Sequence, residues 1–587
     1  MTREIAFPRT RHLALFESGQ EREAKATGSE AILVPIVDAD AARQAAGQPP
    51  AGMPLPPPAE PGGPGVPEKG DLPAASPTEG LAAGVQEPVP QAHQLPWVVG
   101  VDISVPAGEA DRCRTPDGSP ATVRCPSSLE GRSAAGDAAA KAALLGEAVL
   151  LSGLDRWYAM GPSDAGYCRS CELALVEHLR ESYGDHLTPF DPLEQLRSSA
   201  LPERERPFAL QKEALRLAEA TEATKRAVLR ARDEARRSRS VEIAVLGRVG
   251  VLSALSLEIC RHLDGLVFEL ASLDPMAELL PLLAVRAALG QRPAVAVLRP
   301  SATAAQVRQF AALCAACDCD LMLAPEASAE AREALSQHRG FMELLRERYR
   351  PSAPLADVEV LVSPRCDHWM GGAHQRAAAT AVAALARAQL QPAVRLDLPG
   401  GIGATLLVLA GAGALNAADA TAARRHVEAG GDLLLFGRAA PADEEGRIGD
   451  PLFPEVKSGL DRVGEGRVYA LEDAAQLPRA LRELGGRPQV SLTGRGKLWA
   501  RAYLDPERKL DVHLVNLDLR ESAFVPAQGM QLQIAGQAAG GGRSGYWFSP
   551  DRDGGKDGER ITLNPSGFSV STILPSIEAY ALLAVPR

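Results

Sequence analysis

The sequence predicts an α/β protein of several domains: a TIM-like (β/α)8 barrel, a flavodoxin-like α/β domain and a C-terminal antiparallel β-sandwich. Three observations lead to this prediction. Short apolar runs alternate with helical segments over the first half of the chain. A second, shorter set of such runs follows. After about residue 490 the pattern changes to strands separated only by turn-rich gaps.

The barrel prediction depends on counting apolar runs. Two occur in residues 1–45, HLALF and AILVPIVDA, and we assign them to the first barrel strands. The remaining runs lie within 96–355 and include PWVVGVDISVP, VEIAVLG, DGLVFEL, PAVAVLRP and CDLMLAP, with helical segments between them. Apolar runs of this length separated by helices are typical of buried parallel strands. The total is about eight, enough for a closed barrel, and a doubly wound sheet is the competing architecture.

Residues 46–95 are dominated by proline, glycine and alanine. Such a composition cannot bury enough apolar surface to offset chain entropy, so we predict a disordered insert or linker. A docking site for a proline-binding module is the alternative.

Two further domains are predicted after the barrel. Residues 356–485 contain DVEVLVSP, AVRLDLP, TLLVLAGA and GDLLLFG around two helical segments, a pattern typical of a flavodoxin-like sheet. Residues 486–587 contain alternating runs such as KLDVHLVNLD and MQLQIAG, which indicate a small β-sandwich.

Composition excludes several classes of protein. Lys and Arg number 63 against 74 Asp and Glu, a net charge of −11, which argues against binding to nucleic acid or an anionic membrane. We find no apolar window long enough to span a membrane and no signal peptide, so we expect a cytoplasmic protein. Nine cysteines are too few for a disulfide scaffold, which favours reduced thiols or a metal site.

Four segments carry a resemblance to a known family. They are RCPSSLEGR at 124–132, the stretch from GLDRWYAMGPSDAGYC to the YGD turn at 153–191, TLLVLAGAGALNAADATAARRHVEAGGDLLLFG at 405–437, and VHLVNLDLR with ILPSIEAYALLAV. In this order they resemble glycoside hydrolase family 42, the β-galactosidase-like enzymes. The resemblance implies a catalytic barrel, a flavodoxin-like domain tied to trimer formation, a C-terminal sandwich and a saccharide substrate.

Retaining glycosidases need two carboxyl groups about 5 Å apart. Glu269 ends the run DGLVFEL, where a barrel strand opens into the pocket, and the resemblance implies a glutamate nucleophile at a late strand end. The family carries an Asn-Glu pair after the fourth strand, and this chain has none there. Asp155 and Asp164 are the acid/base candidates in that stretch; ion pairing or turn chemistry is the alternative for all three residues.

Aromatic residues near this stretch could stack on a sugar ring. Trp157, Tyr158 and Tyr167 lie beside the Asp155–Asp164 loop, and Trp369 lies in a second-domain loop that could approach the pocket. Packing in a core or an interface is the alternative for each of them.

Four cysteines predict a structural zinc site. Cys168 and Cys171 form a CxxC, whose two thiolates suit a tetrahedral ion. The resemblance implies a zinc held by cysteines after the third and fourth strands, which matches Cys125 and this CxxC. Cys113, in the same predicted loop as Cys125, is the candidate for the fourth ligand. Free thiols packed in a loop, or a Cys113–Cys125 disulfide, are the alternatives.

The sequence therefore predicts a glycoside hydrolase-like protein that cleaves a β-linked saccharide with paired carboxylates, forms a trimer and binds no nucleic acid or membrane. The alternative is an inactive carbohydrate-binding or assembly protein on the same scaffold, a pseudoenzyme that has lost its acid/base residue. A scaffold whose proline-rich segment recruits partners is a third hypothesis.

Overall fold

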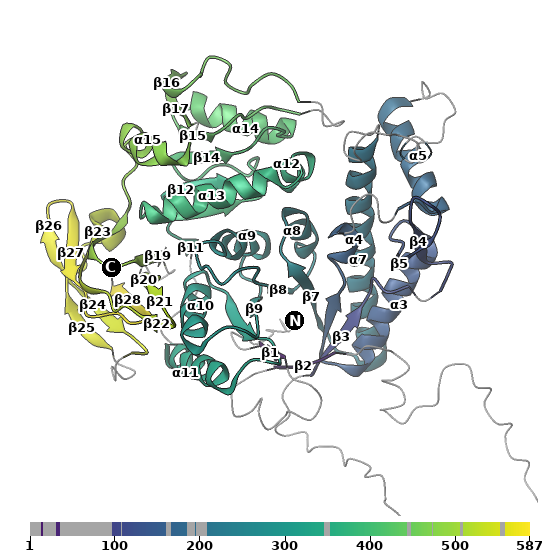
Figure 1. The fold of residues 1–587 in the computed structure, drawn as a ribbon, viewed down its shortest axis with the longest axis horizontal. Helices are drawn as coiled ribbons and strands as arrows, with labels where there is room; N and C mark the ends of the chain where they lie inside the picture. The colour runs from purple at the N-terminus through teal and green to yellow at the C-terminus, as the bar shows by residue number, and fades with distance from the viewer. Residues whose placement is uncertain are drawn as a thin grey trace, which may run out of the picture.

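Four large sheets organise the described part of the chain in the computed structural model (Figure 1). The structure describes residues 13–15, 31–35, 97–106, 108–159, 166–184, 194, 196, 208–345, 353–442, 448–471, 473–504, 509–551 and 558–586. The proline-rich segment 46–95 lies outside these residues, so its predicted role stays a prediction.

The first sheet has eight strands in the order β1-β2-β3-β6-β7-β8-β9-β10. Every neighbouring pair is parallel. The outer strands β1 and β10 lie against each other, so the sheet curls round on itself. The strands are β1 Leu13–Leu15, β2 Ala31–Pro35, β3 Trp97–Asp102, β6 Ala148–Ser152, β7 Ala244–Val251, β8 Gly265–Glu269, β9 Ala294–Leu298 and β10 Asp320–Leu323.

Helices connect these strands and cover the outside of the sheet (Figure 1). Several begin at the side-chain caps that free backbone N–H groups require; the side chain of Ser128, for example, accepts from Gly131 at the start of α3. The longest of the helices described, α7, carries many charged residues. The elements are the hairpin β4 Arg112–Arg114 and β5 Pro120–Arg124, then α3 Leu129–Leu145, α4 Arg156–Ala159, α5 Arg169–Tyr183, α7 Ala209–Arg239, α8 Ala254–Cys260, α9 Leu279–Leu289, α10 Ala304–Ala316 and α11 Ala329–Leu345.

Strand alternation divides the apolar residues of this sheet between two cores. Successive side chains along a β-strand point to opposite faces of the sheet. Val99, Val149 and Phe268 join the large core shared with the helices. A separate cluster takes the alternate residues of six strands: Val98, Ala148, Leu150, Ala244, Leu246, Val267, Val295, Val297 and Met322. This second cluster defines the inner face of the curled sheet.

The second sheet has the order β13-β12-β14-β15-β17-β16. All pairs are parallel except β16 with β17. The two expected helices near 373–390 and 417–429 are present. The elements are β12 Val358–Leu361, α12 Pro364–Trp369, α13 Ala373–Arg387, β13 Pro392–Arg395, β14 Leu406–Ala410, α14 Ala417–Glu428, β15 Asp432–Phe436, β16 Gly459–Val463, β17 Gly466–Leu471, the 3-10 turn η4 Ala474–Gln476 and α15 Leu477–Glu483.

The C-terminal part contains two antiparallel sheets that share one apolar core. One sheet is β11 Ala353–Pro354, β19 Leu498–Leu504, β20 Lys509–Asn516, β28 Tyr580–Pro586, β24 Ser544–Phe548 and β25 Glu559–Thr562. The other is β18 Val490–Arg495, β23 Gln528–Ala535, β27 Ser569–Ile573 and β26 Asn564–Ser566. The short β21 Leu519–Arg520 and β22 Ala523–Phe524 pair with each other, and α16 Gly536–Ala539 follows β23. The α/β multidomain class is therefore confirmed.

Buried side chains join these parts to one another. Gln391, at the start of the second sheet's β13, donates to the carbonyl of Ala500 and accepts from the N–H of Ala502 on β19. Gln309 on α10 donates to the carbonyl of Asn516 at the end of β20, at 3.0 Å. Both glutamines are almost fully buried, and buried amides need hydrogen-bond partners. These hydrogen bonds therefore join the sandwich to the other two parts at two seams, the interfaces with the second sheet and with α10.

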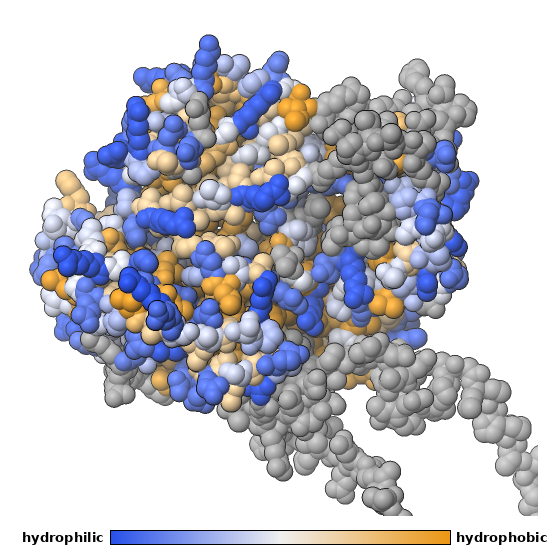
Figure 2. Space-filling model, viewed as in Figure 1, coloured by the Kyte–Doolittle hydropathy of each residue, from blue (hydrophilic) through white to orange (hydrophobic). Residues whose placement is uncertain are grey.

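On the face shown in Figure 2, hydrophobic residues lie in small groups separated by charged ones. Among the residues described, none of the helices combines the length and apolar character that crossing a membrane would need.

Candidate functional site

Charged side chains lie on the inner face of the eight-stranded sheet, at the C-terminal ends of its strands. Leu246 and Val267 belong to the inner cluster, so Arg248 and Glu269, two residues further along β7 and β8, point to the same face. By the same alternation Asp102 follows Val98 on β3. Parallel strands bring these ends to one edge, where ligands of such sheets bind.

Glu269 occupies the predicted strand end and is open to solvent. Its side chain is 48% exposed, and its Oε1 lies 3.4 Å from the guanidinium of Arg248, which is 37% exposed. An ion pair this exposed adds little to stability.

Asp155 follows β6, the fourth strand of the sheet, as predicted. β7 has an irregular register between Val249 and Val251, and the extra residue there is Gly250. A bulged residue leaves the ladder, so its N–H is free to bond elsewhere. The Gly250 N–H donates to Asp155 Oδ2 at 2.8 Å. One strand, β7, therefore separates Asp155 from Glu269. Asp164 lies outside the described residues.

Asp102 is a strand-end carboxylate that the sequence analysis missed. Its Oδ1 accepts from the N–H and hydroxyl of Ser104, and its Oδ2 lies 3.3 Å from Arg156. Gly153 at the end of β6 has φ of 77°, and a Cβ there would lie 2.1 Å from Asp102 Oδ1. The signal was available, because Asp102 ends WVVGVD in the same way that Glu269 ends its own run.

Glu278 is a second carboxyl group that sequence reasoning missed, because nothing in its local pattern marks it. It precedes α9 in the loop after β8, is almost fully buried, and accepts from the N–H of Ser272 at 2.6 Å. Burial raises the pKa of Glu278 to about 7, against hydrogen bonds from the loop backbone and the nearby Arg299 guanidinium, which lower it. Arg299 also donates to the carbonyl of Ala271 in this loop.

The predicted aromatic platform is not open to a sugar where the structure describes it. Trp157 is 1% exposed, and its Nε1 donates to the carbonyl of Arg124 at the end of the hairpin. Tyr167 is 3% exposed and the ammonium of Lys212 covers its ring, 3.5 Å from the centroid. Trp369 is half-buried on α12 beneath the guanidinium of Arg365. The side chain of Tyr158 lies outside the described residues.

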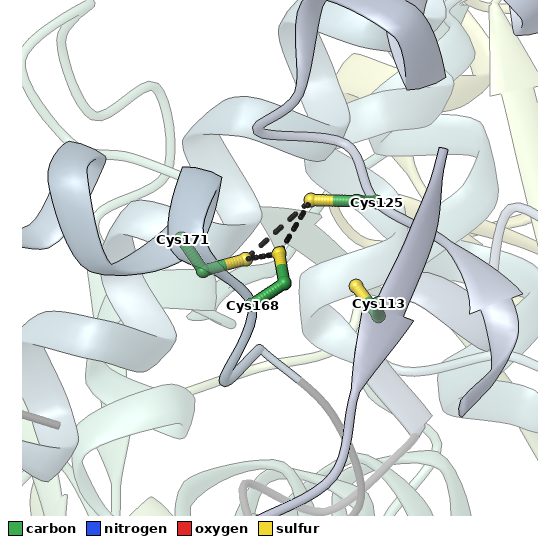
Figure 3. A group of neighbouring side chains, drawn as sticks. All are labelled: Cys113, Cys125, Cys168 and Cys171. Carbon is green, nitrogen blue, oxygen red and sulfur yellow. Dashed lines mark hydrogen bonds between the residues drawn. The ribbon is translucent and has the colours of Figure 1, made fainter. Parts of the chain in front are cut away.

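The four predicted cysteines come together, although they come from two separate loops (Figure 3). Cys113 lies on β4, Cys125 follows β5, and Cys168 and Cys171 lie at the start of α5. All four Sγ atoms lie within 4.8 Å of one another. The Sγ of Cys125 is 3.4 Å from that of Cys168 and 3.5 Å from that of Cys171. All four are free thiols, so the disulfide alternative is not observed.

The sulfur geometry fits a tetrahedral metal ion. Metal–sulfur bonds of about 2.3 Å in a tetrahedron place sulfurs about 3.8 Å apart, close to the distances seen. Hydrogen bonds from Cys113, Cys125 and Cys171 lower the pKa of the Cys168 thiol, whereas the pKa values of those three thiols are raised. Without a metal the cluster therefore favours one thiolate, on Cys168, which is the form that binds metal. The cluster could therefore hold a metal ion.

Buried polar contacts fix the hairpin that supplies two of these thiols. Arg124 and Asp111 form an ion pair at 2.9 Å with both side chains 5% exposed. Arg124 also donates to the carbonyl of Ile103, and the N–H of Cys125 donates to the carbonyl of Asp111. The cluster thus ties the hairpin after β3 to the start of α5.

Comparisons with known proteins identify the fold. No family model matches the chain, and no curated protein sequence matches it. Solved structures do. A β-galactosidase from Bacillus circulans sp. alkalophilus superposes with a TM-score of 0.64 at 11% identity over 99% of both chains. A GH42 β-galactosidase from G. stearothermophilus gives 0.63 at 10% identity, over 99% of this chain and 98% of its own. α-L-Fucosidase isoenzyme 2 from Paenibacillus thiaminolyticus gives 0.57 at 13% identity, over 84% and 88%.

The fold is thus one that glycoside hydrolases use. Within that class, the chain is a remote structural relative of the family 42 β-galactosidases, which confirms the predicted resemblance at the level of the fold. The fucosidase match shows that this fold alone does not specify the sugar.

Proposed function

We propose that this protein is a glycoside hydrolase-like protein that acts on a β-linked saccharide at the carboxyl edge of its eight-stranded sheet. The observation that carries the proposal is the position of Glu269: it ends β8, faces inward, is open to solvent and lies beside Arg248. A carboxylate so placed can reach a ligand held over the strand ends.

We assign the roles from the predicted chemistry. Glu269 is the nucleophile, and Asp155 or Asp164 is the acid/base. Asp155 Oδ2 accepts from Gly250, a contact that holds the carboxyl group at the strand ends. The reaction needs one carboxyl group to attack the anomeric carbon and another to protonate the leaving oxygen.

The architecture we propose has three domains. They are a closed (β/α)8 barrel made of 1–45 and 96–355, a flavodoxin-like trimerisation-type domain at 356–485 and a β-sandwich at 486–587. The curled parallel sheet and its enclosed apolar cluster support the barrel. Size measurement in solution tests the trimer.

We propose zinc as the metal of the cysteine cluster. Cys113, Cys125, Cys168 and Cys171 would hold it, and four thiolates with no open position make such a site structural. Its contribution is to fix the segment after the fourth strand, which positions Asp155 and Asp164 for the chemistry.

A non-catalytic carbohydrate-binding or assembly protein is the second candidate. Two observations favour it. The chain has no Asn-Glu pair after the fourth strand. Both described candidate carboxylates already have partners within the protein, Glu269 with Arg248 and Asp155 with Gly250.

The test replaces the carboxylates one at a time. Glu269→Gln, Asp155→Asn and Asp164→Asn are assayed on aryl β-glycosides and oligosaccharides. Glu222→Gln is the matched control, since Glu222 is 45% exposed and pairs with Arg226 on α7, away from the strand ends. We expect Glu269→Gln to lower kcat by a factor on the order of 10^4 and the control to match wild type.

Two results would contradict the proposed enzymatic activity. One is the absence of turnover by the wild type on every substrate, and the other is a Glu269→Gln variant as fast as wild type. Saccharide binding without turnover selects the second candidate.

A further inference from the structure

We propose that a cavity between α11 and the C-terminal sandwich is a second saccharide-binding site, distinct from the strand-end site. Its volume is about 850 Å³. Its lining comes from α10, α11 and two sandwich segments, and it includes Arg308, Gln337, His338, Phe341, Leu344 and Glu578.

The size of the cavity suits a small oligosaccharide. Ligand sites commonly enclose about 300–1,000 Å³. The cavity lies at the seam of two packed parts, where such sites often form. α10 and α11 are outer helices of the eight-stranded sheet, so this position is separate from the inner-face residues at the strand ends (Figure 1).

The charges in the cavity exclude an anionic ligand. Arg308, the cation of the lining, already pairs with Asp551 at 2.6 Å and Glu578 at 2.7 Å. Burial lowers the pKa of His338 to about 4, with help from the Arg339 and Arg308 guanidinium groups, so its imidazole is neutral near neutral pH. Two carboxylates against one guanidinium leave the lining without positive charge to spare. A neutral ligand fits this balance.

The lining combines apolar and polar groups in the way a sugar requires. Phe341 and Leu344 offer apolar surface on α11; Leu344 is 45% exposed and the Phe341 ring packs edge-on against Tyr580 at 6.0 Å. The CH face of a sugar ring stacks on such surface. Gln337 is exposed and the side chain of Glu578 is 46% exposed, and they offer amide and carboxylate groups to hydroxyls beside their contacts with Glu333 and Arg308.

An unpartnered buried nitrogen gives independent support. His338 lines the cavity and is over nine-tenths buried, and among the described residues its Nε2 has no hydrogen-bond partner. That nitrogen is itself enclosed, so a ligand reaches it only when the side chains over it shift. A hydroxyl group can donate to or accept from a neutral imidazole, so a sugar that enters this far would supply the missing partner. The choice of a saccharide over another neutral polyol rests on the proposed function.

The experiment is titration calorimetry of the full chain with β-linked galacto- and gluco-oligosaccharides of two to four units. Gln337→Ala and His338→Phe test the cavity, and the phenylalanine keeps the ring that packs against Tyr580 at 5.7 Å. Glu269→Gln tests the strand-end site. Glu330→Ala is the control, because Glu330 lies in the first turn of the same helix and does not line the cavity.

We expect two sites in the wild type and in Glu330→Ala. Each cavity variant should weaken one of them at least tenfold. Hydrogen exchange should show that the saccharide protects 329–345 in wild type and Glu269→Gln but not in His338→Phe. Wild-type affinity and stoichiometry in both cavity variants, or no saccharide binding by the wild type, would overturn the proposal. If the wild type has a single site and only Glu269→Gln loses it, the proposed function stands and this inference is refuted. If only the cavity variants lose the single site, this inference stands and the proposed strand-end site is refuted.

Discussion

The cysteine cluster and the strand-end carboxylates occupy the same edge of one sheet but are organised differently. The four thiols converge to within 4.8 Å of one another. The carboxylates Asp102, Asp155 and Glu269 each contact a different group: Arg156, the Gly250 N–H and Arg248. The cluster is therefore arranged around one shared point, whereas the carboxylates are spread along the strand ends. The first arrangement suits an ion and the second an extended ligand.

The largest effect is expected when the cysteine cluster is disrupted. Cys125→Ala should lower bound zinc from one equivalent to near zero, because Cys125 contacts both cysteines of the CxxC. A ligand present at about a thousand times its Kd stabilises a fold by about 4 kcal/mol, so a loss of about that size should follow. Elemental analysis and thermal unfolding with and without a chelator measure both effects.

Cys260→Ala is the control for that prediction, since Cys260 is a buried free thiol outside the cluster. It should keep the metal. An unchanged metal content in Cys125→Ala would show that the cluster is no metal site.

The next effect is the pH dependence from Glu278, on the carboxylate side of the comparison. Its folded pKa is about 7 against an ordinary value of 4.5, so the folded state keeps a proton that the unfolded state loses. The stability that this proton contributes is complete below pH 4.5 and is lost as the pH rises through 7. The loss is about 3 kcal/mol.

Glu278→Gln keeps the acceptor for the Ser272 N–H and cannot ionise. In urea unfolding, the free energy of unfolding of the variant relative to wild type should be higher at pH 8 than at pH 4.5 by about 3 kcal/mol. Parallel pH profiles for the two proteins would refute this role for Glu278.

A smaller effect separates backbone strain from crowding at the strand ends. Gly153→Ala should cost about 1–3 kcal/mol, because φ is 77° and the new Cβ would press on Asp102. Gly290→Ala is the matched control, with φ of 63° and nothing within 4 Å of the added atom. Chemical unfolding measures both. Equal costs would mean that the contact with Asp102 adds nothing.

The smallest effect on stability comes from Arg248. Arg248→Ala should change the free energy of unfolding by less than about 1 kcal/mol, because its pair with Glu269 is exposed. The same variant should alter saccharide affinity or kcat. If it loses stability instead and leaves ligand binding unchanged, the pair is structural and the strand-end site loses its main support.

Much of the fold was predictable because its signals are local. GLVFE and AVAVL are apolar runs bounded by helices, and they form β8 and β9. The CxxC was visible for the same reason, and it brought the fourth-strand loop into the metal prediction. The antiparallel hairpin of β16 and β17 was not foreseen, because its strands carry exposed charged residues such as Asp461.

The site was less predictable because its members depend on contacts between strands. Trp157 resembles a sugar platform in sequence, yet only the position of the hairpin carbonyl at Arg124 decides that its indole packs inward. The environment of Glu278 is likewise set by loop closure around α9, and no spacing rule reports it. Spacing identified Glu269, but not the bulge at Gly250 that anchors Asp155.

The glutamine contacts at the seams have a practical consequence for dissecting the chain. Truncating the chain before β18 would remove the Gln391 side chain, which hydrogen-bonds to the backbone of Ala500 and Ala502. It would also remove the Gln309 side chain and leave the carbonyl of Asn516 facing water. An isolated C-terminal fragment would also expose the apolar surface that now covers α10. Crystallography and binding assays should therefore use a polypeptide that keeps all four large sheets together.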